Sequence, residues 1–233
     1  MSRGHRKLAG PRAAPTPSRA KPPRAVVGVV ESGNSAVLVT VDAGGELLDR
    51  RRVDLTPPGT PTHPHHHEGS WAVGRYRTSP WAREISLTEA IALVERVRAS
   101  AERGAREALD ALAAAVPVPI ERIALRVCPE LPPTTEACIA DNHAQTVADS
   151  VMYPRALALA GEARGWSVDW YDRDAVHREA SQAVDGEDLD ALLSAMGRSI
   201  GAPWQAAHKL AAIAAIVALG RPRVRAAKDR SGA

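Results

Sequence analysis

The segment over residues 25–55 constrains the fold most, because it contains the patterns of three consecutive strands, separated by tight turns. Four valines around Gly28 form the first run, and a Ser-Gly-Asn turn of the kind that joins antiparallel strands follows it. A second β-branched run covers residues 36–41, and a Gly-Gly turn leads into a third run over 46–55. The sequence therefore predicts a meander of three strands.

A single acidic residue, Glu31, closes the first of these strands. An ionised side chain at the end of an apolar, buried strand is costly unless a partner compensates its charge. We therefore expect a metal, a cation or a hydrogen-bond donor beside Glu31. The alternative to a functional role is a structural carboxylate that caps a helix or pairs with an arginine.

Strands and helices alternate in the remainder of the chain. The Pro-, His- and Trp-rich segment 57–85 has no clear periodicity and is expected to be a loop inserted into the domain. Ser86 and Glu89 match a capping box that opens a long amphipathic helix ending near Pro117. Strands are then expected at 120–128 and 167–171, and helices at 135–164 with a kink at Pro154, 174–183, 187–196 and 203–219. This order predicts an α/β fold with a mixed sheet and helices on both of its faces.

Basic residues are concentrated at the two ends, although the net charge is only +3. Residues 1–24 contain seven Lys and Arg residues and no acid, and residues 221–233 form a second basic tail. The first segment is too poor in large apolar residues to fold, so it is predicted to be a disordered tail that attracts nucleic acid through phosphate charge. A solubilising leader without a partner is the alternative. The domain itself, residues 25–220, is acidic, which argues against a broad nucleic-acid-binding face on it.

Composition indicates a cytoplasmic protein without membrane association. The longest apolar stretch, 210–219, is too short and too rich in alanine to span a bilayer, and the N-terminus lacks the apolar core of a secretion signal. The two cysteines, Cys128 and Cys138, cannot form a disulfide framework, and they suit a reducing compartment.

Three segments together resemble the ribonuclease H-like superfamily, and within it the Holliday-junction resolvases of the RuvC type. The segments are VVGVVESGNSAVLVTVD, ALALAGEARGWSVDWYDRDAV and DLDALLSAMGRSIGAPWQAAHKLAAIAAIVAL. The first is similar to the family's opening hairpin, the second to a helix leading into a strand, and the third to its final pair of helices. The resemblance implies a ribonuclease H-like mixed sheet, in which parallel strands follow the antiparallel meander, and a homodimer as the assembly.

The resemblance also implies a metal site, because known members hold two divalent metals, Mg²⁺ or Mn²⁺, in a cluster of carboxylates. Glu31 matches the first acid, where the family more often has Asp, and Glu130 is the nearest match to the second. In the last helix, Gln205 and His208 stand where the family has acids, so His208 becomes a candidate metal ligand beside Glu31 and Glu130. Asp172 is a substitute for a lost catalytic acid.

Two of these residues also have structural interpretations. His208 fits a partly buried helix histidine, and Asp172 fits an N-cap at the start of the following helix.

The sequence is compatible with two functions. One is a divalent-metal-dependent nuclease acting on structured DNA or RNA, with Glu31, Glu130, His208 and Asp172 as its catalytic residues. The other is a catalytically inactive scaffold that binds nucleic acid or a protein partner, which Lys209 or an arginine placed on Glu31 would indicate. A sugar-kinase-like relative shares the opening meander, but its Gly-rich phosphate loop fits residues 31–34 poorly.

The motif HPHHHEG at residues 63–69 is a second chemical candidate within the inserted loop. Neighbouring imidazoles with Glu68 could bind Zn²⁺, and Trp71 and Tyr76 could stack on bases. Histidine tracts without fixed spacing seldom define a coordination geometry, so a solvated polar loop is the favoured interpretation. If functional, the loop would be a lid or contact surface over the edge of the sheet that carries Glu31.

Overall fold

The structure is a computed structural model that describes residues 24–66, 85–184 and 188–220. The two basic tails predicted from the sequence lie outside these ranges, except for Arg24. Residues 67–84, which include the second half of the HPHHHEG motif, also lie outside the described part of the chain.

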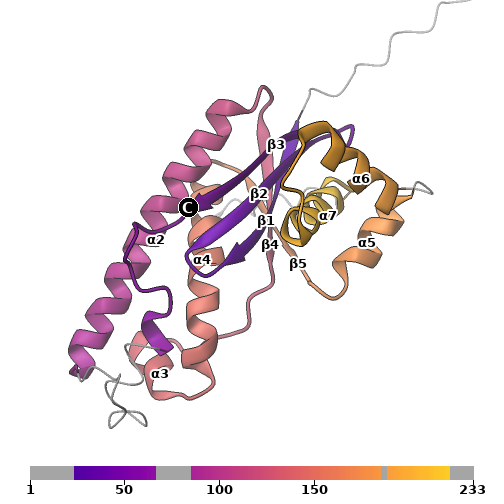
Figure 1. Cartoon of the computed structure of the whole chain (residues 1–233). Helices are drawn as coiled ribbons and strands as arrows, with labels where there is room; N and C mark the ends of the chain where they lie inside the picture. The colour runs from indigo at the N-terminus through magenta and orange to yellow at the C-terminus, as the bar shows by residue number, and fades with distance from the viewer. Residues whose placement is uncertain (1–23, 67–84, 185–187, 221–233) are drawn as a thin grey trace, which may run out of the picture.

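The centre of the structure is a five-stranded sheet with the order β3-β2-β1-β4-β5 (Figure 1). The first three strands, β1 (Ala25–Ser32), β2 (Ser35–Asp42) and β3 (Leu47–Asp54), pair antiparallel, which confirms the predicted meander. β4 (Ile120–Arg126) and β5 (Ser167–Tyr171) continue the sheet parallel to β1. The mixed sheet predicted from the sequence, with an antiparallel meander followed by parallel strands, is thus confirmed.

Helices cover both faces of the sheet, as predicted. The long α2 (Leu87–Ala115) and α4 (Ala144–Ala163) lie on one face, and the short α3 (Thr135–Ala140) packs against both (Figure 1). α7 (Ala206–Gly220) covers the other face, flanked by α5 (Val176–Ala183) and α6 (Leu189–Ile200). Alternate residues of β1 divide between the two cores: Val27 and Val29 pack on the α2/α4 side, and Val26 packs on the α7 side.

Local signals set most helix ends, with one exception. The capping box is present at Ser86, whose hydroxyl accepts from the Glu89 amide while the Glu89 carboxylate accepts from the Ser86 amide. The single helix predicted over 135–164 is wrong, because the chain breaks into α3 and α4 at residues 141–143. Asp141 Oδ1 accepts from the amides of His143 and Ala144, so this side chain starts a new helix.

Among the described helices, none is long and apolar enough to cross a membrane.

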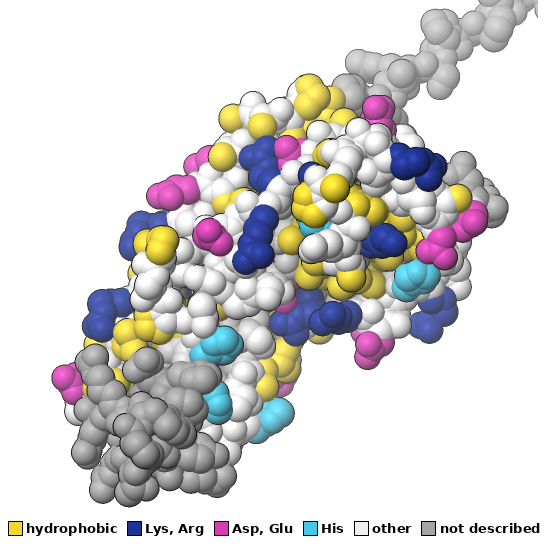
Figure 2. Space-filling view, viewed as in Figure 1, with side chains coloured by type: hydrophobic (Ala, Val, Ile, Leu, Met, Phe, Trp, Pro, Cys, Tyr) yellow, Lys and Arg dark blue, Asp and Glu magenta, His cyan; other side chains and the backbone are white. Residues whose placement is uncertain are grey.

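Charge of both signs is spread over the described surface. On the face shown in Figure 2, basic and acidic side chains are interspersed, and several histidines gather beside the segment drawn in grey. Along the sequence, the strongest concentration of positive charge is in the two terminal segments.

Gly28 allows α7 to pack directly on β1. A Cβ atom at this position would overlap the carbonyl oxygen of Ala211 and would lie 2.8 Å from the amide nitrogen of Ala215. Both obstacles belong to the helix backbone, so they cannot move away as a flexible side chain could.

Gly28→Ala is therefore expected to lower the free energy of unfolding by about 3 kcal/mol, because α7 must shift away from the sheet. Gly220→Ala, at the end of the same helix, is the matched control, since its Cβ would make only an ordinary contact with Ala183 at 3.9 Å. Urea unfolding followed by circular dichroism measures both variants. Equal stability of the two would contradict the close contact between α7 and β1.

Candidate functional site

Glu31 at the end of β1 forms an ion pair with Arg126 at the end of β4. Arg126 Nε donates to Glu31 Oε1 at 2.6 Å, and the side chains are 7% and 27% exposed for Glu31 and Arg126. The two strands are parallel neighbours, so their carboxyl ends meet at one edge of the sheet. The partner that the sequence analysis required for Glu31 is thus an arginine, at the strand end where the resemblance implied a second acid.

Arg126 is also anchored to α4, because its Nη2 donates to the carbonyl oxygen of Ser150 at 3.3 Å. Pro154 lies four residues after Ser150 inside α4 and has no amide hydrogen. The Ser150 carbonyl therefore lacks its usual donor in the helix, and the guanidinium of Arg126 supplies one. The proline at which the sequence predicts a kink thus opens an acceptor for Arg126.

The groups next to this pair are held in their neutral forms. The Tyr171 hydroxyl donates to the carbonyl oxygen of Val29 at 2.9 Å, and burial, with Glu31 nearby, raises the pKa of this phenol. Burial also raises the pKa of the Cys128 thiol, although Arg126 partly opposes the shift. Neither side chain is an activated nucleophile at neutral pH.

The other predicted acids lie apart from Glu31. Glu130 is exposed on the segment that follows β4, four residues beyond the arginine of the pair. Asp172 is exposed at the end of β5, and β4 lies between β5 and β1, so the expectation that Asp172 could lie beside Glu31 is not met. Asp172 Oδ1 instead accepts from the amide of Asp174 at 2.8 Å, in the turn that leads to α5. The N-cap of α5 is Ala175, so Asp172 caps this turn rather than the helix.

His208 lies in the first turn of α7, on the opposite face of the sheet from Glu31. Its residue exposure is 7%, its Nδ1 accepts from the amide of Gln205 at 3.0 Å, and its ring stacks on Trp204. Burial, followed by the charge of Arg50, lowers the pKa of His208. Glu31 shares the alternation of Val27 and Val29, which pack toward α2 and α4, so the sheet separates it from His208.

The structure therefore does not bring Glu31, Glu130, His208 and Asp172 together. Among the described residues, no three His, Cys, Asp or Glu side chains gather in a way that could hold a metal ion. The metal-ligand and catalytic roles assigned to these four from the sequence stay predictions. Arg126 received no role from the sequence. The sequence does place it at the end of β4, and β4 runs parallel to the strand at whose end Glu31 lies, so its position was the available signal.

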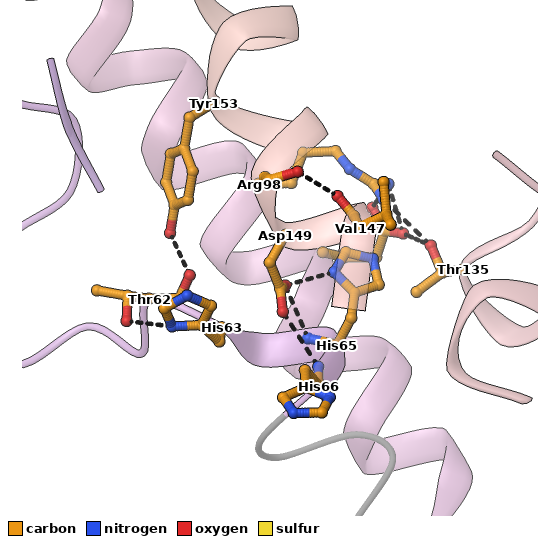
Figure 3. Close-up of polar contacts among 11 residues, drawn as sticks. Thr62, His63, His65, His66, Arg98, Thr135, Val147, Asp149 and Tyr153 are labelled. Atoms are coloured by element: carbon orange, nitrogen blue, oxygen red, sulfur yellow. Dashed lines mark hydrogen bonds and ion pairs between the residues drawn. The ribbon is translucent and has the colours of Figure 1, made fainter. Parts of the chain in front are cut away.

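A second polar cluster surrounds Asp149 of α4 (Figure 3). Its carboxylate is 1% exposed and accepts from the His65 Nδ1 at 2.7 Å, the His65 amide at 3.0 Å and the His66 amide at 3.1 Å. One turn further along α4, the Tyr153 hydroxyl donates to the carbonyl oxygen of Thr62 at 3.0 Å. The solvated loop favoured for the HPHHHEG motif is therefore wrong at His65, which is buried against α4. The sequence signal for this contact was Asp149, an acid within the apolar stretch of α4 that needs a partner when buried.

Strand order and helical layers define the class: this is an α/β domain built on a mixed five-stranded sheet with helices on both faces. No protein-family model and no curated protein matches the sequence. Among solved structures, the chain is similar to RuvC of Thermus thermophilus in complex with a Holliday junction substrate, with 15% identity and a TM-score of 0.43. A second structure of Thermus thermophilus RuvC gives 16% identity and a TM-score of 0.42. Both comparisons cover 84% of this chain and 93% of the other. At this level the likeness concerns the course of the chain and does not extend to activity.

Glu31→Gln is expected to lower the free energy of unfolding by about 2 kcal/mol, because it leaves the Arg126 guanidinium without its charged partner. Arg126→Met should cost a similar amount, and the double variant should cost clearly less than the sum. Glu95→Gln is the matched control, since it removes an ion pair whose side chains are 38% and 50% exposed. Denaturant unfolding gives all four values, and strictly additive costs for Glu31 and Arg126 would show that the pair is not coupled.

Burial of His208 predicts a specific dependence of stability on pH. Because its pKa in the folded state is lowered, the unfolded chain takes up the proton first as the pH falls. The contribution of His208 is therefore complete above the ordinary histidine pKa of about 6.5 and is lost as the pH falls from there through the lower pKa of the folded state.

His208→Gln keeps an acceptor for the Gln205 amide but removes this titration. The wild-type protein should lose more unfolding free energy between about pH 7.5 and about pH 5.5 than the variant does. His177→Gln, which changes an exposed histidine in α5, should retain the wild-type loss. Urea titrations at the two pH values measure the difference, and identical losses in wild type and His208→Gln would refute the assignment.

Proposed function

We propose that this chain is a catalytically inactive ribonuclease H-like domain that serves as a binding scaffold for nucleic acid. The observation that carries the proposal is the ion pair between Glu31 and Arg126. It occupies the edge of the sheet where the resemblance implied that carboxylates hold the metals. The fold is retained, and the charge at this edge is neutralised within the protein.

Metal chemistry of the resolvase type requires negative charge that is available to a cation. Mg²⁺ binds oxygen ligands in a near-octahedral arrangement, and two-metal hydrolysis needs several carboxylates around one position. Glu31 is the one acid at the predicted position, and its Oε1 lies 2.6 Å from a guanidinium nitrogen. A divalent cation at this oxygen would meet the positive charge of Arg126. Displacing the arginine would also remove the donor from the Ser150 carbonyl.

Nucleic acid is proposed as the partner because positive charge is concentrated in the terminal segments. Seven basic residues without an acid in residues 1–24 are typical of segments that bind phosphate without sequence preference. On the face shown in Figure 2, positive and negative side chains are interspersed, which favours contact through these segments rather than through that face. A protein partner, a homodimer and a cytoplasmic location remain predictions from the sequence and its resemblance.

The full-length protein is expected to bind branched, duplex and RNA–DNA hybrid substrates without cleaving them in Mg²⁺ or Mn²⁺. Binding should weaken steeply as salt rises, because released counterions drive it, and a variant lacking residues 1–24 and 221–233 should bind much more weakly. Electrophoretic mobility shifts and cleavage assays on the same labelled substrates measure both properties. Metal-dependent cleavage by wild type that disappears in Glu31→Gln would establish the nuclease instead.

Arg126→Asp is a control in the same protein. It places a second carboxylate beside Glu31, so the variant should be less stable without metal and should gain thermal stability when Mn²⁺ is added. Wild type should show no such gain. Stabilisation of wild type by Mn²⁺ that depends on Glu31 would contradict the proposed neutralisation.

A further inference from the structure

A cavity of about 280 Å³ lies between α2, α4 and the segment that leads into α3. Its lining combines aliphatic walls with cationic side chains from two helices: Leu131, Met152, Leu159, Arg98, Arg155 and His65. The volume is at the lower end of the range for small-molecule sites, so it suits a ligand built around a single ring. Neither Glu31 nor Arg126 lines the cavity, so a ligand in it does not require the proposed function.

His65 is the buried polar side chain of this cavity, and Asp149 fixes its orientation. The imidazole is 3% exposed, and Asp149 Oδ1 holds both its Nδ1 and its backbone amide (Figure 3). The ring extends from Asp149 toward the side on which Arg98 and Thr135 lie, in agreement with the lining of the cavity. No described residue forms a hydrogen bond with Nε2 of His65. The carboxylate at Nδ1 fixes the orientation of the ring, so Nε2 is the nitrogen that can meet a ligand.

Two arginines bring positive charge to the same cavity from different helices. Arg98 of α2 donates to the Glu95 carboxylate at 2.7 Å and to the Thr135 hydroxyl at 3.3 Å, so it is held in place. Arg155 of α4 is exposed, and within the described part of the chain no hydrogen bond or ion pair engages its guanidinium. Glu102 is the one carboxylate of the lining. A guanidinium without a partner at the mouth of an apolar cavity is a ready donor for an anionic group.

We propose that this cavity binds a small organic anion that carries a phosphate or carboxylate group on an apolar body. The anionic group accepts from the guanidinium of Arg155 and from the Nε2–H of His65, whose ring carries both of its protons in this complex while Nδ1–H donates to Asp149. The apolar body lies against Leu131, Met152 and Leu159. Asp149 is a positioning residue, because it acts on the ligand only through the orientation of His65.

Phenyl phosphate, phenylacetate and uncharged benzyl alcohol are the probes, titrated into the full-length protein by isothermal calorimetry. At least one of the two anions is expected to bind saturably, and benzyl alcohol is expected not to. Arg155→Ala should weaken anion binding roughly tenfold, the loss of one charge-assisted hydrogen bond. Arg106→Ala, an exposed arginine of α2 outside the cavity lining, is the matched control and should bind as wild type does. Arg155 is exposed, so thermal melting should show unchanged folding in both variants.

Nitrogen-15 spectra of the histidine rings provide a readout at His65 itself. Anion binding should shift the Nε2 resonance of His65, assigned by its loss in His65→Gln, and should leave the exposed His177 unchanged. Binding of phenyl phosphate alone identifies a phosphate ester as the ligand class, and binding of phenylacetate alone identifies a carboxylate. Absence of saturable binding for both anions overturns the proposal. Equal binding by wild type and Arg155→Ala, or an unshifted His65 in the saturated protein, also overturns it.

Discussion

An ion pair between Glu31 and Arg126 ties together the three elements that meet at one edge of the mixed sheet. The pair joins the ends of β1 and β4, and the second contact of Arg126 joins both strands to α4 through the Ser150 carbonyl. A carboxylate that is only 7% exposed requires compensation of its charge, and the guanidinium provides this through the hydrogen bond from its Nε. The hydrogen bond from its Nη2 to the Ser150 carbonyl holds the guanidinium in place. The same contact that stabilises the edge also removes the free carboxylate that a metal would need. The ion pair therefore determines both how the three elements are held together at this edge and whether the Glu31 carboxylate can bind a cation.

The sheet itself decides which of the remaining polar residues can act together. Successive residues of a strand point to opposite faces, so Glu31 belongs to the face covered by α2 and α4, while His208 lies in the first turn of α7, which covers the other face. The close packing of α7 at Gly28 leaves no room for a side chain to pass between helix and strand. His208 is consequently satisfied within its own helix end, by the Gln205 amide and the ring of Trp204. Retention of a fold thus does not imply retention of the site that other proteins build on it.

The elements that could be predicted from the sequence are those determined by local patterns. Alternation and turn residues specified the meander, and the spacing of Ser86 and Glu89 specified the start of α2. The break between α3 and α4 was missed because Asp141 acts as a local cap inside a segment with continuous helical spacing. The contacts of Arg126 and His65 could not be predicted because their partners lie 95 and 84 residues away in the sequence. Sequence patterns identify a buried charge that needs a partner, but the identity of that partner follows only from the packed structure.

α4 shows how a few polar groups in an apolar helix organise two separate regions. Asp149 and Tyr153 hold the segment from Thr62 to His66, whereas the neighbouring Ser150 carbonyl receives Arg126 from the sheet edge. Each contact exists because an ordinary helix feature is altered: Pro154 withholds an amide from Ser150, and Asp149 places a carboxylate where the helix is otherwise apolar. A buried group of this kind is costly unless satisfied, so it fixes the position of whatever satisfies it. In this protein those groups fix an arginine at the end of β4, beside Glu31, and a histidine at the wall of a cavity.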